Sequence, residues 1–101
     1  MSLLFRFKVS GHSMEPFLKP GQEILVSSLP YLISKPKIGD VVAFRDNQTF
    51  IVKRIKDTGI DKYLMAGDNA NDSKDYGWIT RERIVGKLIY RLRSEGIKTP
   101  S

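Results

Sequence analysis

The fold is decided by the stretch GDVVAFRDNQTFIVKRI, residues 39–55. Two apolar runs, Val41–Arg45 and Thr49–Ile55, flank the compact polar turn Asp46–Gln48. Residues with β-branched and aromatic side chains favour strands, and polar residues between two such runs favour a tight turn. We therefore predict a β-hairpin whose second strand carries Lys53.

Further short strands are predicted on both sides of this hairpin. Apolar and polar residues alternate from Leu3 to Val9, and this period of two is typical of a half-buried strand. Three more strands are predicted at Glu23–Ser27, Tyr63–Ala66 and Ile84–Arg93. The connections are predicted as a surface loop at Leu29–Lys37, a polar loop at Gly67–Gly77 and one helical turn at Thr80–Arg83. The pattern indicates an all-β fold, a small single-domain barrel or sandwich of short, mostly antiparallel strands.

The length and composition fit one small globular domain. The 101 residues include 41% hydrophobic residues, enough for one core and no more. We expect a single domain over residues 1–101, with its core at about residues 3–93 and a flexible tail at residues 94–101. The absence of cysteine excludes disulfides, thiolate zinc sites and a cysteine nucleophile. With His12 as the only histidine, we expect no metal and no cofactor.

The basic charge is spread along the chain. The net charge is +6, but lysines and arginines form no polybasic block, so we expect a solvated basic surface and no nucleic acid as partner. No segment approaches the roughly 20 apolar residues of a transmembrane helix. These features predict a soluble, cytoplasmic protein, with peripheral membrane contact, or contact through a partner, as the alternative.

Two residues suggest catalytic chemistry. Ser13 lies in SGHSMEP, residues 10–16, and Lys53 interrupts the apolar run FIVKRI, residues 50–55. A lysine among apolar groups can lose its proton near neutral pH and then take the proton of a serine hydroxyl. Such serine–lysine pairs are a known variant of the catalytic triad. We therefore predict Ser13 as nucleophile and Lys53 as general base of a peptide-bond hydrolase. The alternatives are an ordinary turn serine and a surface lysine whose stem covers apolar surface.

Four sequence boxes together resemble the catalytic core of type I signal peptidases. In chain order they are SGHSMEP (10–16), GDVVAF (39–44), VKR (52–54) and GDNANDSKD (67–75). The resemblance implies the all-β core that these enzymes share with repressor peptidases. It also implies a serine endopeptidase that removes N-terminal leader or signal peptides through an acyl-enzyme. Many bacterial members carry a second β-domain after the lysine, for which this chain has no room, so it resembles a minimal soluble core.

The resemblance also implies roles for the loop after residue 66. Ser73 falls where the family has a serine that orients the lysine through a hydrogen bond. Asp68 and Asp75 resemble the acidic residues that support this loop. Gly77 stands where members often carry an arginine, so the loop departs from the family pattern there.

The expected substrate is a polypeptide whose N-terminal leader binds as an extended strand. Gly11 stands where some members have a serine that helps to bind the oxyanion, so this role would fall chiefly on the backbone N–H of Ser13. A shallow pocket that accepts small residues such as alanine is predicted to be formed by Val9, Met14, Leu18 and Val52.

Three other functions remain open from the sequence. The first is a dedicated soluble maturation protease, such as the leader peptidase of nickel superoxide dismutase. The second is a self-cleaving regulator of the repressor type, which uses the same serine–lysine pair but normally carries a DNA-binding domain. The third is a catalytically silent peptide-binding module that uses the same cleft.

Overall fold

The predicted hairpin lies at the centre of the structure. In the computed structural model, which describes residues 3–72 and 76–94, β3 (Val41–Asp46) and β4 (Thr49–Thr58) pair in antiparallel fashion from Val41↔Arg54 to Asp46↔Thr49. The turn residue Asn47 has φ of 58°, a left-handed conformation that asparagine tolerates better than most residues.

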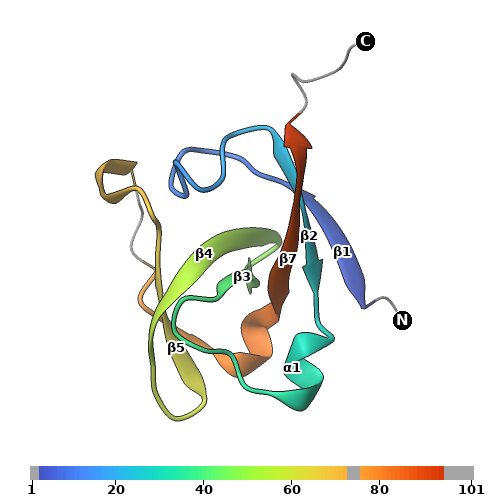
Figure 1. Cartoon of the computed structure of the whole chain (residues 1–101). Coiled ribbons are helices and arrows are strands. Elements are labelled where there is room, and N and C mark those ends of the chain that lie inside the picture. Colours follow the sequence, from blue (N-terminus) through green and yellow to red (C-terminus); the bar gives the residue numbers. More distant parts are fainter. Residues whose placement is uncertain (1–2, 73–75, 95–101) are drawn as a thin grey trace.

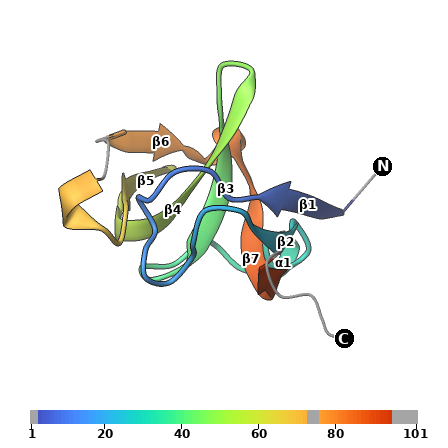
Figure 2. The same ribbon diagram turned by 90° about the horizontal axis from the view of Figure 1, so that it is seen from above.

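The strands form one antiparallel sheet. Its seven strands follow the order β1-β2-β7-β3-β4-β5-β6 (Figure 1). The remaining strands are β1 (Leu4–Lys8), β2 (Gln22–Ser27), β5 (Lys62–Ala66), β6 (Trp78–Thr80) and β7 (Ile84–Ser94). The all-β prediction is therefore confirmed. Figure 2 shows β1 and β6 well apart, as expected for the two ends of this strand order.

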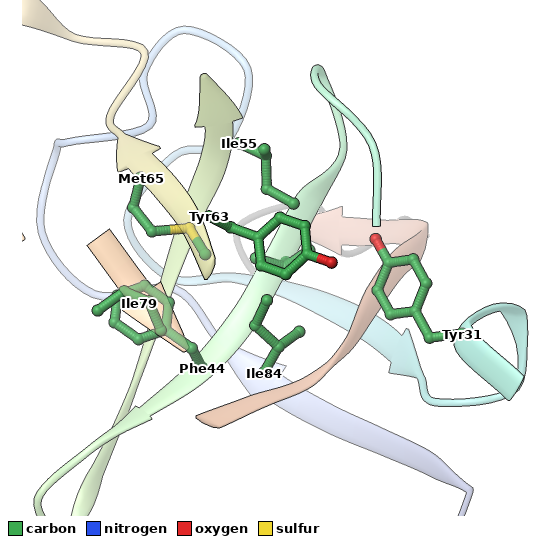
Figure 3. Close-up of a cluster of buried hydrophobic side chains, with 8 residues drawn as sticks. Tyr31, Phe44, Ile55, Tyr63, Met65, Ile79 and Ile84 are labelled. Carbon is green, nitrogen blue, oxygen red and sulfur yellow. The ribbon is translucent and has the colours of Figure 1, made fainter. Parts of the chain in front are cut away.

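β3 lies between β7 and β4 in the sheet, and its first four residues are buried on both faces. Val42 and Phe44 belong to one hydrophobic cluster, called here the tyrosine cluster. Its other members are Tyr31, Ile55, Tyr63, Met65, Ile79 and Ile84, and Figure 3 shows their side chains gathered together. Val41 and Ala43 point to the opposite face and belong to the loop cluster. Its other members are Met14, Leu18, Ile24 and Val26.

Two short elements differ from the sequence prediction. The expected surface loop Leu29–Lys37 contains a helix, α1 (Pro30–Ile33). Proline is suited to the first turn of a helix, and the Tyr31 hydroxyl donates a 2.6 Å hydrogen bond to Asp40 Oδ2. β6 was not predicted, since three residues are too short to show an alternating pattern.

Other boundaries lie close to the predicted ones. β4 continues three residues beyond Ile55, and β7 ends at Ser94, the first residue of the predicted tail. Arg81–Arg83 forms a 3-10 turn, as expected. Within residues 3–72 and 76–94, no helix has the length and apolar character needed to cross a bilayer.

Candidate active site

A cleft of about 280 Å³ opens where β1 and the loop that follows it approach the first half of β4. Its walls are formed by residues 7–14, residues 50–53 and Tyr76. Ser13 and Lys53, which are 40 positions apart in the sequence, therefore lie in the walls of one cleft.

The cleft lies between two strand edges. β1 lies at one end of the sheet, and in the described part of the chain it pairs with β2 alone. β5 pairs with β4 only from Arg54 onward. In the described part of the chain, residues 49–53 of β4 therefore pair with β3 on one side only. Strand edges with unused backbone groups are the places where extended peptides add to a sheet.

Ser13 lies in the loop between β1 and β2, and this loop is anchored by its own core residues. Gly11 has φ of 79°, which is the left-handed region where glycine is strongly favoured. The Met14 and Leu18 side chains are buried in the loop cluster, and the Leu18 N–H donates to the Met14 carbonyl at 2.9 Å. The half-buried Ser13 is thus held between a flexible glycine and a turn fixed to the core.

The loop is also held from the other side of the cleft. The Asn69 N–H donates to the Ser13 carbonyl at 2.8 Å, and Asn69 Nδ2 donates to the His12 carbonyl at 3.0 Å. The views agree that the segment with the 3-10 turn Ala70–Asp72 lies beside the loop after β1 (Figures 1 and 2). Asn69 therefore links the box that begins with Gly67-Asp68-Asn69, called here the GDN box, directly to the box SGHSMEP (10–16).

Lys53 projects from β4 into an apolar environment. It shares a strand face with Ile51 and Ile55, which pack in the tyrosine cluster, and only 3% of its surface is exposed. Its Nζ lies 5.5 Å from the centre of the Tyr76 ring. Burial disfavours the charged form of an amine, whereas the face of an aromatic ring attracts it, so these two surroundings act on the lysine in opposite directions.

Arg54 points to the other face of β4, where it is half-buried. Its guanidinium donates from Nε and Nη2 to the two carboxylate oxygens of Asp68, both at 2.8 Å. It also donates from Nη1 to the Gly39 carbonyl at 2.9 Å. The hydrogen bond with Asp68 raises the pKa of Arg54, so the guanidinium stays charged. Bidentate pairs of this type fix geometry as well as charge.

The remaining predicted residues fall into three groups. Val9, Met14, Val52 and Gly11 line the cleft with Ser13 and Lys53. Leu18 does not line it, because its side chain is fully buried in the loop cluster. Ser73 and Asp75 lie outside the described residues, so their predicted roles stay predictions.

Sequence reasoning missed three aromatic residues of the cleft. Phe7, Phe50 and Tyr76 all line it, and the Phe7 and Phe50 ring centres are 5.3 Å apart. The pair joins β1 to β4 across the gap between the two strand edges. The alternating pattern of residues 3–9 placed Phe7 on one strand face, but nothing local in the sequence indicated its contact with Phe50.

His12 lines the cleft at an exposed position. Its Nδ1 lies 3.1 Å from Glu15 Oε1. In the described part of the chain, no three His, Cys, Asp or Glu residues are grouped in a way that could hold a metal ion.

The sequence matches a known protein family. Residues 1–58, more than half of the chain, match the family model described as signal peptidase, peptidase S26. The chain therefore belongs to the signal peptidase family S26, a family of proteases. The matched range contains Ser13 and Lys53 but not the GDN box. No curated protein matches the chain.

Proposed function

We propose that this protein is a serine endopeptidase that removes N-terminal leader or signal peptides with Ser13 as nucleophile and Lys53 as general base. One observation carries the proposal: in a chain of family S26, Ser13 shares a cleft with a lysine that is 3% exposed. A serine needs a nearby base to become a good nucleophile, and a buried amine can supply one.

The proposed reaction is acyl transfer. Neutral Lys53 takes the Ser13 proton while Oγ attacks the scissile carbonyl carbon. The tetrahedral intermediate then collapses, and the ammonium of Lys53 gives its proton to the leaving amine. Lys53, neutral again, removes a proton from water, which attacks the ester carbonyl. As the bond between Ser13 Oγ and the acyl carbon breaks, Lys53 returns this proton to Oγ, and the new carboxylic acid leaves. The Ser13 N–H would donate to the oxyanion.

The substrate would bind as an extended strand between β1 and residues 49–53 of β4. The two edges supply backbone donors and acceptors without regard to sequence, and the side chains of Val9, Met14 and Val52 would contact the substrate residue at the scissile bond. A leader peptide is suited to this mode because it has no fold of its own that must be opened first.

The test compares substitutions of the proposed groups with substitutions of like residues in the same cleft. We expect Ser13→Ala and Lys53→Ala each to reduce cleavage of an internally quenched leader peptide by at least about a thousandfold. Ser10→Ala and Lys8→Ala change the same residue types in the cleft wall and should leave most activity. Wild-type cleavage should rise with pH, because the reaction needs the neutral amine.

Two outcomes would sink the proposal. The first is full cleavage by Ser13→Ala or Lys53→Ala. The second is binding of the leader peptide by the wild type with no cleavage at any pH, which would instead identify a catalytically silent peptide-binding module.

A further inference from the structure

Phe17 contacts two guanidinium groups from different strands. Arg54 Cζ of β4 lies 4.9 Å from the centre of the Phe17 ring, and Arg91 Cζ of β7 lies 4.5 Å from it. Arg91 also donates from Nη1 to the Phe17 carbonyl at 3.3 Å. We propose that Phe17, through this contact with Arg54 and Arg91, is a positioning residue for Ser13; the inference rests on the proposed function.

The physical basis is the charge distribution of the ring. The faces of an aromatic ring are negative, so they attract cations such as the two guanidinium groups. Two guanidiniums brought together would normally repel, but Asp68 neutralises Arg54 through its bidentate pair. The two arginine contacts therefore favour one orientation of the Phe17 ring, whereas an aliphatic side chain of similar size would have no comparable preference.

Phe17 transmits this orientation to Ser13 through a short turn. Three residues lie between Ser13 and Phe17, and the bond from the Leu18 N–H to the Met14 carbonyl closes a turn that contains Phe17 and begins directly after Ser13. The side chains of Met14 and Leu18 anchor this turn in depth, because both are buried in the loop cluster. Phe17 itself is half-buried, and its contacts with the two arginines restrict the position of its ring.

Arg54 connects these ring contacts to the second attachment of the serine loop. Its partner Asp68 precedes Asn69, whose N–H donates to the Ser13 carbonyl at 2.8 Å. Arg54 also follows Lys53 directly on β4, so the same strand carries the proposed general base and one of the two arginines that contact Phe17. This arrangement sets the position of Ser13 relative to Lys53, and reaction rates depend steeply on such positions.

The experiment distinguishes the effect of the aromatic ring faces of Phe17 on kcat from the effect of its apolar volume. We expect Phe17→Leu to lower kcat for the quenched leader peptide by about tenfold to a hundredfold, with KM within about twofold of the wild-type value. Phe17→Tyr keeps both ring faces and should retain activity close to that of the wild type. Arg91→Gln should also lower kcat, and its effect should be smaller in the Phe17→Leu background, because there the contact between guanidinium and ring is already lost and only the hydrogen bond to the carbonyl of residue 17 is left to remove.

A matched control lies at the other end of the sheet. Lys62 Nζ is 5.1 Å from the centre of the Trp78 ring, so Trp78→Leu removes a contact of the same kind outside the cleft. It should leave kcat unchanged. Thermal melting of every variant checks that the fold is retained, and Arg91→Gln, at an exposed position, tests the idea independently if Phe17→Leu does not fold.

Wild-type kcat in folded Phe17→Leu, or additive effects of Phe17→Leu and Arg91→Gln, would overturn the inference. Its failure is distinct from failure of the proposed function. If Ser13→Ala is inactive and Phe17→Leu is fully active, only the positioning role is lost; if Ser13→Ala still cleaves, the proposed function itself is wrong.

Discussion

Lys53 and Arg54 are adjacent in the sequence, but their side chains lie on opposite faces of β4 in different environments. The apolar residues around Lys53 are close in sequence, so its burial could be predicted from the run FIVKRI. The partner of Arg54 is Asp68, 14 positions away, and no local pattern indicated that pair. Local sequence therefore predicts which face of a strand a residue occupies, but it does not predict a contact that depends on how two loops meet.

The same limit applies to the polar contacts among Tyr31 of α1, Asp40 and Lys87. Tyr31 was predicted to lie in a loop, yet its hydroxyl donates to Asp40, and Lys87 Nζ lies 3.5 Å from the other oxygen of that carboxylate. Burial first, and then the hydrogen bond to Asp40, raise the pKa of Tyr31 above the ordinary value of 10.0. The phenol therefore stays neutral in the folded protein under conditions in which it ionises in the unfolded chain.

We expect Tyr31→Phe to lower the free energy of unfolding by about 1 kcal/mol at neutral pH, because one buried hydrogen bond is lost. Since the pKa is raised on folding, the stability that Tyr31 contributes is complete below about pH 10 and is lost as pH rises further. The stabilities of wild type and Tyr31→Phe should therefore converge above that pH in urea titrations.

Tyr90→Phe is the control for this comparison, because Tyr90 is an exposed tyrosine. It should follow the wild type at every pH. Parallel stability curves for wild type and Tyr31→Phe through the alkaline range would contradict the assignment.

At the scale of elements, the hairpin of β3 and β4 was predictable because both strands are long and have a clear turn between them. α1 and β6 were not, since each is stabilised by contacts with distant residues. Ile79 of β6 is buried in the tyrosine cluster, and β6 pairs with β5 from Lys62↔Thr80 to Leu64↔Trp78. Tertiary packing decides the structure of such short segments more than their own propensity does.

The close packing of β7 against β2 gives a prediction at this scale. A Cβ atom added to Gly86 would lie 2.5 Å from the Ser27 carbonyl oxygen and 2.7 Å from its carbon. Backbone atoms in the middle of a sheet cannot easily move, so we expect Gly86→Ala to destabilise the protein by roughly 1–3 kcal/mol. Thermal or urea unfolding measures this.

Gly59→Ala is the matched control. Its added Cβ would meet the side chain of Lys62 at 3.0 Å, and a flexible lysine can move away. It should therefore change stability much less than Gly86→Ala. Equal effects of the two substitutions would show that the predicted contact with Ser27 is not what limits position 86.

At the scale of the whole molecule, the sheet has two edges that face one cleft. If the substrate joins them as a strand in the cleft, outward-pointing N–H groups among residues 7–8 of β1 and residues 50–52 of β4 gain hydrogen bonds. We expect hydrogen exchange of these amides to slow when Ser13→Ala is saturated with an uncleaved leader peptide. The amides of β6, at the opposite end of the sheet, serve as the internal control. Protection of β6, or of neither edge of the cleft, would argue against strand addition.

The place of Lys53 between Ile51 and Ile55 has a consequence for how this family member can diverge. The face of β4 that carries Lys53 also carries side chains of the hydrophobic core, so the same few residues contribute to stability and to the proposed chemistry. A smaller residue at either neighbour would admit water to the amine, and hydration favours the charged form of an amine. In the proposed mechanism, natural variation at these two positions would therefore shift the acidity range in which the protein works, even in homologues whose catalytic groups are unchanged.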